Sequence, residues 1–199
     1  MNPVLREGNS DRRAAKAVKN YAKKYPHTMG AWSADSKSHV SHMDSGDFFE
    51  NEKSIVMTQD DSLSIVFDDG TNARTLKDGI KVEQAEVVDA TYLSKNALTR
   101  FLEQEIAATQ PGVLFSLHLK ATMMKISDPI LFGHAVKVYY KAAFEKHAEV
   151  FAQLGVDPNN GVGDAYDKVA QLPVDQAAAI KADLDACVAN GPDLAMVNS

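Results

Sequence analysis

Apolar residues recur at helical spacing in five stretches of the chain, and polar loops or shorter apolar runs separate these stretches. In the first stretch, Val18, Tyr21 and Tyr25 follow one another at intervals of three and four residues, and Pro26 ends the pattern. This predicts a helix over about 11–25. The same spacing predicts helices over about 96–109, 129–154, 164–171 and 174–189. Amphipathic helices are therefore expected to form most of the core.

Between the first two predicted helices the pattern changes to that of strands. Leu63, Ile65 and Phe67 alternate with other residues, and Asp68-Asp69-Gly70 then reads as a turn. Further short strands are predicted at 54–57, 80–82 and 87–93, with a long loop at 27–47. The gaps between these strands are too short for parallel crossovers, so we expect antiparallel pairing.

A last apolar run, VLFSLHLKATM at 113–123, predicts a buried strand. Helices and strands together predict an α/β fold with α+β elements, in which helices flank a mixed sheet with antiparallel strands. The stretch GVDPNNGVG at 155–163 is the best candidate for an internal boundary. We therefore predict an α/β segment over 1–155, as part of a larger domain, and a truncated helical C-terminal segment over 156–199.

The composition is that of a folded domain, acidic overall but basic at its start. The 199 residues are 45% hydrophobic and carry a net charge of −6, which argues against a nucleic-acid partner. The first 25 residues nevertheless hold seven basic side chains against Glu7 and Asp11, so this end can attract an anionic ligand. The basic residues are Arg6, Arg12, Arg13, Lys16, Lys19, Lys23 and Lys24.

Features that mark secreted or membrane proteins are not found in the sequence. No run of 18 apolar residues occurs, and the first residues lack the apolar core of a signal peptide, so no membrane partner is expected. The single cysteine, Cys187, excludes an intrachain disulfide and a multi-thiolate zinc site. These features predict a cytoplasmic location.

Two motifs allow both a functional and an ordinary interpretation. His39, His42 and Asp44 together have the chemistry of zinc ligands, but histidines in a polar loop are usually solvated or hydrogen-bonded. The glycines of GVGDAY at 161–166 suggest a nucleotide-binding loop. The third glycine and a preceding strand are missing there, which favours a turn at the start of a helix.

Stronger candidates lie at the start of the chain and at the end of the apolar run. Arg6 and Arg12, with Gly8 between them to permit a turn, carry guanidinium groups that bind carboxylates in bidentate fashion. Alternatively, they pair with surface acids at the start of a basic helix. Lys120 exchanges protons near neutral pH if it is desolvated, or simply extends from the sheet into solvent. The residue pattern alone leaves both alternatives open.

Two long blocks resemble the monomeric type of NADP-dependent isocitrate dehydrogenase of bacteria. The first runs over 2–49 and starts NPVLREGNSDRR, and the second, SLHLKATMMKISDPILFGHAVKVYY, runs over 116–140. The resemblance covers essentially the whole chain. It implies an isocitrate dehydrogenase-like fold and the oxidative decarboxylation of isocitrate to 2-oxoglutarate. It also implies NADP and Mg or Mn as cofactors, in a parent enzyme that is monomeric.

The resemblance also implies roles for four residues. The family's substrate motif is an asparagine followed by two arginines, and it matches Asn2, Arg6 and Arg12, with Asn2 also beside the nicotinamide of NADP. Lys120 matches the catalytic lysine. Paired arginines suit a substrate with three carboxylates, and a lysine can take the proton of the hydroxyl group that is oxidised.

The sequence also departs from the family. Family chains are much longer, their substrate motif starts with a serine upstream of the asparagine, and their metal-binding aspartates match no residue of this sequence. We therefore expect an interior piece of the enzyme, inactive alone and with exposed apolar surface. The alternative is a non-catalytic, self-associating domain derived from the same family.

Overall fold

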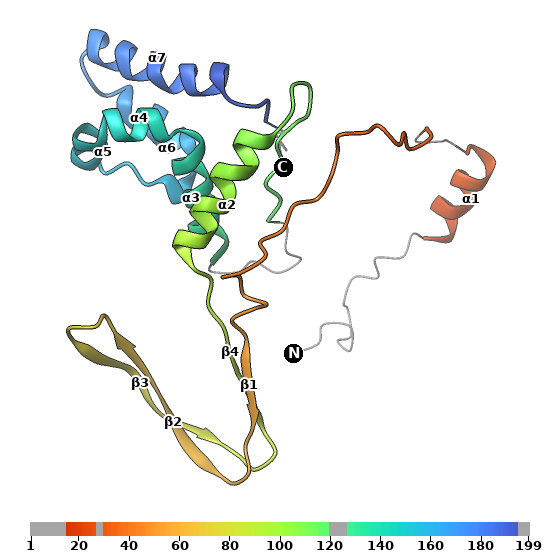
Figure 1. The fold of residues 1–199 in the computed structure, drawn as a ribbon, viewed down its shortest axis with the longest axis vertical. Coiled ribbons are helices and arrows are strands. Elements are labelled where there is room, and N and C mark those ends of the chain that lie inside the picture. The colour runs from red at the N-terminus through yellow and green to blue at the C-terminus, as the bar shows by residue number, and fades with distance from the viewer. Residues whose placement is uncertain (1–14, 27–29, 120–126, 195–199) are drawn as a thin grey trace. The chain divides into compact units, whose positions relative to one another are not determined.

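The computed structural model describes residues 15–26, 30–119 and 127–194. The chain divides into two compact units, Met1–Lys37 and Ser38–Ser199. The described residues contain both helices and antiparallel strands, which confirms the mixed α/β class (Figure 1). No helix in the described ranges combines the length and the hydropathy that a membrane crossing would need.

The described part of the first unit contains one helix, α1 (Lys16–Lys24). It confirms the part of the helix predicted over 11–25 that falls within the described residues. Every residue of α1 is exposed, and the rings of Tyr21 and Tyr25 lie 4.8 Å apart on its apolar side. The amphipathic pattern therefore forms a helix whose apolar side remains open to solvent.

The second unit contains four strands, paired as two nested antiparallel ribbons. The outer ribbon joins β1 (Lys53–Val56) to β4 (Val87–Ala90), and the inner ribbon joins β2 (Asp61–Asp68) to β3 (Ala73–Val82). Antiparallel pairing was predicted correctly. The expected single mixed sheet flanked by helices is wrong for the described residues, because each ribbon is a separate sheet of two strands.

A tight turn at the predicted position connects β2 to β3. The carboxylate of Asp69 accepts hydrogen bonds from the backbone N–H groups of Thr71 and Asn72, at 2.9 and 2.7 Å. These bonds stabilise the charged form and lower the pKa of Asp69, with the bond from Asn72 as the larger cause. Gly70 has a φ of +84°, a conformation that favours glycine. The local sequence therefore fixes this turn without help from the rest of the fold.

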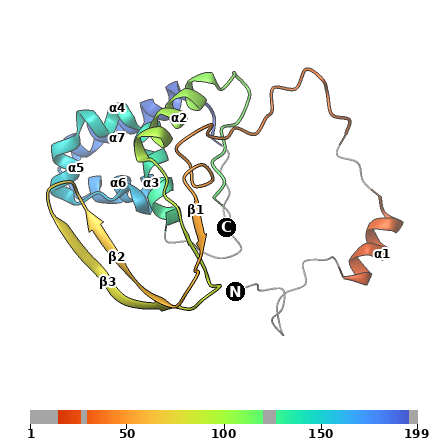
Figure 2. The same cartoon turned by 60° about the horizontal axis from the view of Figure 1, so that its bottom comes forward.

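Apolar side chains remain exposed on both faces of the inner ribbon. Ile65, Val66 and Phe67 are consecutive in β2 and are each about half exposed. Because neighbouring residues of a strand point to opposite faces, both faces present apolar surface. The helices do not cover this ribbon, as the views in Figures 1 and 2 agree.

Helices form the rest of the second unit (Figure 2). The first of them, α2 (Lys95–Ala108), begins at Ser94, whose side chain accepts a hydrogen bond from the N–H of Ala97. The others are α3 (Ser127–Tyr139), α4 (Lys141–Lys146), α5 (Ala148–Leu154), α6 (Val162–Val169) and α7 (Val174–Asn190), with a short 3₁₀ helix, η2 (Pro158–Asn160). Predicted helices at 96–109, 164–171 and 174–189 thus correspond to α2, α6 and α7.

The larger hydrophobic core, called here the α7 core, lies where α3 to α7 meet. Ile180 and Leu184 of α7 are almost completely buried in it, as the apolar spacing of this helix predicted. The core consists of Val136, Tyr140, Ala143, Phe151, Ala165, Val169, Ile180 and Leu184. Its residues come from both sides of residue 155, so helices across the predicted boundary share one core.

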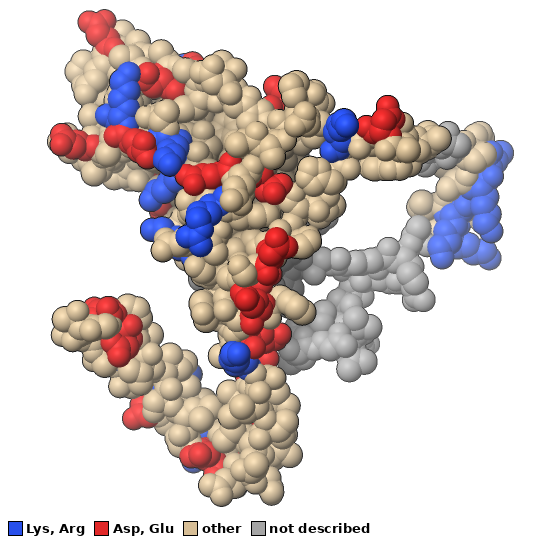
Figure 3. Space-filling view, in the orientation of Figure 1, with Lys and Arg blue, Asp and Glu red and all other residues tan. Residues whose placement is uncertain are grey.

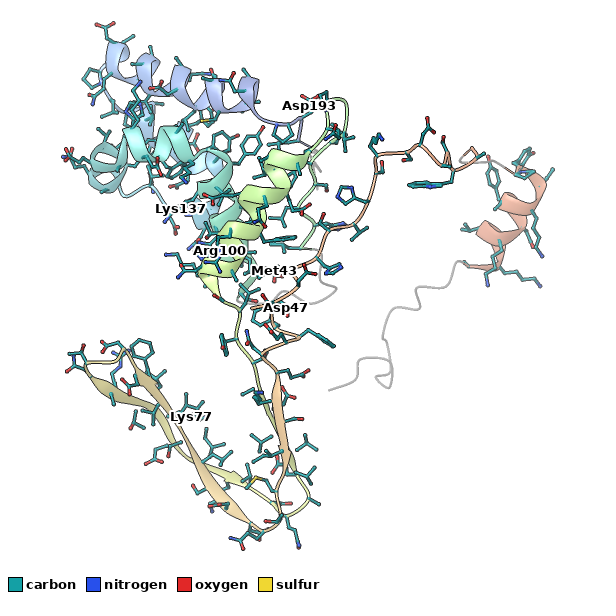
Figure 4. The ribbon with its side chains drawn as sticks, viewed as in Figure 1. Met43, Asp47, Lys77, Arg100, Lys137 and Asp193 are labelled. Atoms are coloured by element: carbon teal, nitrogen blue, oxygen red, sulfur yellow. The ribbon has the colours of Figure 1, made fainter. Side chains whose placement is uncertain are left out.

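A second cluster, called here the α2 core, joins α2 to α3 and to two loop segments. Its buried residues are Leu98 and Leu102 of α2 and Ala135 of α3. Met43 from the long loop packs against them (Figure 4). Residues 30–47 of this loop contain no strand. This core therefore connects the loop that precedes the ribbons to the helical body.

The single helix predicted over about 129–154 is wrong, because it is broken twice. The chain leaves helical geometry at Tyr140 (φ −97°, ψ 24°) and at His147 (φ −111°, ψ 23°). A straight helix would turn some of its apolar residues away from the core. The two bends allow Ala143 of α4 and Phe151 of α5 to enter the α7 core together with Tyr140.

The strand predicted at 113–123 is also wrong in its described part, residues 113–119. The only pairing found there among the described residues is an isolated parallel bridge between Phe115 and Leu194. Phe115 and Leu117 pack against the α2 core, whereas Leu114 is exposed. In the sequence, this alternation of buried and exposed side chains looks like that of a strand. In the structure it arises because Phe115 and Leu117 pack against the α2 core.

Candidate functional site

All four predicted site residues lie outside the described residues. Asn2, Arg6 and Arg12 precede residue 15, and Lys120 falls between the described ranges 30–119 and 127–194. Their roles therefore stay predictions. The structure instead shows how the segments on either side of Lys120 are held.

The segment that leads to Lys120 is tied to the body of the second unit. The N–H of Phe115 donates to the carbonyl oxygen of Asp193 at 2.7 Å, and the Phe115 side chain packs on the α2 core. Leu117, two residues further along the chain towards Lys120, packs on the same core. The approach to the predicted catalytic lysine is therefore fixed by both backbone and side-chain contacts.

The segment that follows is anchored by α3, which begins at Ser127. Gly133 of α3 lies so close to Asn159 of η2 that an added Cβ would overlap the Asn159 side chain. Ala135, two residues further along the helix, is buried in the α2 core. Both flanks of residues 120–126 therefore pack on the α2 core, which is the rigid support that a catalytic side chain needs.

A groove of about 550 Å³ runs between α2, α3, α4 and α5, and positive side chains line part of it. We call it the α2–α5 groove. Its basic residues are Lys95 of α2, His134 and Lys137 of α3, and Lys141 of α4. Lys137 is labelled on α3 in Figure 4, and Figure 3 shows basic side chains gathered over α2 and α3. The groove thus has the charge to attract an anion.

The histidine of the groove is held in its neutral form by its surroundings. Burial lowers the pKa of His134 below the ordinary histidine value, and the positive charges of Lys95 and Lys137 lower it further. At neutral pH the ring therefore offers one N–H donor and one acceptor nitrogen. An anion bound beside it would reverse part of this effect by favouring the protonated ring.

No metal site is found where the loop histidines suggested one. His42 lies 3.6 Å from Asp44, whereas His39 faces Glu105 of α2 at 3.8 Å. In the described ranges, no three or more His, Cys, Asp or Glu side chains are grouped closely enough to hold a metal ion. The histidines therefore tie the loop to α2 and to itself.

A polar cluster on the other side of the α7 core has a structural role. His147 Nε2 lies 2.6 Å from the Asp183 carboxylate, and Lys146 Nζ lies 2.8 Å from it. Hydrogen bonds from Lys146 first and His147 second lower the pKa of Asp183. These contacts join the α4–α5 bend to α7.

The comparison with known protein families now decides what this chain is related to. The family model described as monomeric isocitrate dehydrogenase matches residues 1–199, the full length of the chain. The chain belongs to the monomeric isocitrate dehydrogenase family. The resemblance seen in the sequence blocks at 2–49 and 116–140 is thereby confirmed.

Relatives of known name in this family are about half identical to the chain. They include isocitrate dehydrogenase [NADP] 2 of Colwellia maris and isocitrate dehydrogenase [NADP] of Azotobacter vinelandii, each 54% identical. Isocitrate dehydrogenase [NADP] 2 of Mycobacterium tuberculosis is 48% identical. Each match covers 100% of this chain and 27% of the relative, so the chain spans about a quarter of the length of these proteins.

The α2–α5 groove of this member of the monomeric isocitrate dehydrogenase family was not predicted from the sequence. Lys95 sits at the start of α2, while His134 and Lys137 lie on α3, and no short motif links them. Only the packing of α2 against α3 in the α2 core brings these helices together. The spacing of His134 and Lys137, three residues apart on one helix face, was the one signal available.

Proposed function

We propose that this chain supplies part of an enzyme that oxidises isocitrate with NADP and decarboxylates the product to 2-oxoglutarate. The observation that carries the proposal is the match of the monomeric isocitrate dehydrogenase model to the whole chain. Because the chain spans 27% of its NADP-dependent relatives, the complete activity is assigned to a longer protein. The single cysteine suits the reducing cytoplasm, where we place that protein.

In this proposal, Asn2, Arg6 and Arg12 bind the substrate. Isocitrate carries three carboxylates, and each guanidinium can hold one of them through two parallel hydrogen bonds. Two arginines therefore neutralise most of the substrate's charge and fix its orientation. Asn2 contributes a neutral amide that can contact both the substrate and the nicotinamide.

Lys120 acts as the proton acceptor of the oxidation step. As the hydride leaves the carbon that bears the hydroxyl group, the hydroxyl proton moves to the neutral Nζ of Lys120, so that a carbonyl forms. Bound NADP would supply the hydride acceptor, and bound Mg²⁺ or Mn²⁺ the positive charge that stabilises the enolate left by loss of CO₂. We assign the metal no ligand in this chain, because the metal-binding aspartates of the family match no residue of this sequence.

The substrate role of Arg12 is tested in a chimera in which this chain replaces the matching segment of the Azotobacter vinelandii enzyme, to which it is 54% identical. Changing Arg12 to alanine should lower kcat/KM for isocitrate about tenfold to a hundredfold, the effect of losing one charge-assisted contact of about 1.5–3 kcal/mol. The rate of NADPH formation, followed by absorbance, measures the effect.

The matched control is Arg13, which is adjacent in sequence but lies outside the substrate motif. Arg13→Ala should leave kcat/KM within about twofold, as expected for a side chain that does not contact the substrate. Equal losses in the two variants would mean that the basic segment acts through its overall charge. The substrate assignment of Arg12 would then be wrong.

A second function, self-association without catalysis, is favoured by the exposed inner ribbon. Ile65, Val66 and Phe67 present apolar surface on both faces of β2, and a two-stranded ribbon leaves both of its edges unpaired. We propose that isolated copies of the chain associate through this ribbon. In the longer relatives, other parts of the protein are available to cover it.

Light scattering on the isolated chain tests this association. The chain should form dimers or larger species, and changing both Ile65 and Phe67 to lysine should shift it to the monomer. The control places lysines at Ala178 and Ala182, two exposed positions of α7, and should leave association unchanged. A chain that stays monomeric at high concentration would exclude this second function.

A further inference from the structure

The α2–α5 groove contains positive charge that its own acidic residues do not neutralise. Lys141 is paired with Glu103 at 2.8 Å, and Glu145 also acts on it, so both carboxylates of the groove face this lysine. Lys95 and Lys137 form no ion pair within the described residues. The groove lysines without an ion pair in the described part of the chain are therefore Lys95 and Lys137.

His134 lines the same groove as Lys95 and Lys137. Burial lowers its pKa first, and the charges of the two lysines lower it further, so all three basic groups act on one another. Two ammonium groups and one imidazole N–H in this groove are thus possible donors to an anion. They come from α2 and α3, two helices held together by the α2 core.

Apolar side chains also line the groove and pack on the two cores. Phe144 lines the groove and packs edge-on against Phe151, with ring centroids 4.9 Å apart. Phe151 is 4% exposed and belongs to the α7 core, while Val138 packs on the α2 core. Phe144 and Val138 can therefore bind the hydrocarbon part of a ligand without a large rearrangement.

We propose that the α2–α5 groove binds a small phosphomonoester, with the phosphate at Lys95, His134 and Lys137 and the organic group against Val138 and Phe144. Lysine and imidazole suit a phosphate group, whereas planar carboxylate recognition favours arginine, which is not among the groove residues. The volume of about 550 Å³ falls in the range of small-molecule sites. The inference is independent of the isocitrate site, whose predicted residues lie elsewhere in the sequence.

Titration of the 199-residue chain with phenyl phosphate, followed by ¹H–¹⁵N NMR, tests the proposal. Shifts should saturate at about millimolar phenyl phosphate and be confined to residues of α2 to α5. The Lys95→Ala, Lys137→Ala double variant should bind at least about tenfold more weakly, because it loses two charge-assisted contacts. The matched control removes Lys77 and Lys81, two exposed residues of β3, and should bind as the parent does (Figure 4).

Two further readouts separate a specific site from general attraction between charges. Phenyl phosphate should raise the pKa of the His134 ring, and inorganic phosphate should bind several-fold more weakly because it makes no apolar contact. Equal loss of binding in the two double variants, or no saturation, would overturn the proposal. Equal affinity for the two phosphates would overturn the role given to Val138 and Phe144.

Discussion

Changing Lys120 to alanine in the chimera lowers kcat for NADPH formation by about 10²–10⁴-fold, the usual contribution of a positioned acid or base. The physical reason is that the hydroxyl proton of isocitrate then has no acceptor at the moment the hydride leaves. KM should change far less than kcat, because in the proposed site Arg6 and Arg12 hold the substrate carboxylates. Steady-state kinetics over a range of pH measure both quantities.

Lys125 provides the matched control, since it follows Lys120 by five residues and has no role in the proposal. Lys125→Ala should keep kcat within about twofold, and its pH profile should match that of the parent chimera. A Lys120→Ala chimera that retained the parent rate would falsify the catalytic assignment. Parallel losses in both variants would instead indicate that the segment 120–126 is important for folding.

Changing Leu184 to alanine destabilises the second unit by about 2–5 kcal/mol, the range measured when a large aliphatic side chain is removed from a protein core. Leu184 is 0% exposed and packs in the α7 core with residues from α3 to α6, so its removal leaves a cavity at their common centre. Urea unfolding followed by circular dichroism at the helical wavelength measures the free energy of unfolding.

Val188 is the matched control, because it lies on α7 one helical turn after Leu184 but is 45% exposed. Val188→Ala should cost no more than about 0.5 kcal/mol. Similar losses for the two substitutions would contradict the burial of Leu184 in the α7 core. A changed slope of the unfolding curve would show that the variant no longer unfolds as the parent does.

The elements that the sequence predicted well are those with a strong local pattern. In α7 the apolar stripe that includes Ile180 and Leu184 continues over several turns, and in β2 Leu63, Ile65 and Phe67 alternate along one strand. The turn after β2 is fixed by its own aspartate and glycine. In these places no distant contact was needed to determine the structure.

The wrong predictions share a dependence on contacts between distant residues. Nothing near Tyr140 or His147 in the sequence marks a break, because the bends are set by packing into the α7 core. The alternation in 113–119 suggested a strand, but Phe115 and Leu117 instead pack against the α2 core. A pattern of burial is visible in the sequence, whereas the partner that causes the burial is not.

The candidate sites differ in the same way, since one was predicted from local motifs and the other depends on contacts between distant residues. Asn2, Arg6, Arg12 and Lys120 were predicted as site residues because they match short motifs in the sequence blocks that resemble the family. The α2–α5 groove has no motif, since its lysines and histidine lie on two helices that only tertiary packing brings together. A local motif can therefore suggest candidate residues, whereas residues that only tertiary packing brings together leave no such signal in the sequence.

The nesting of the ribbons gives their formation a fixed direction. If β1 and β4 paired first, they would close a loop of about 30 residues, at a corresponding cost in chain entropy. Once β2 has paired with β3 from the turn at Asp69 outward, only short connections remain free, and β1 meets β4 at little further cost. We therefore expect the inner ribbon to form first, starting at the β2–β3 turn. The outer ribbon is expected to form last and to open first.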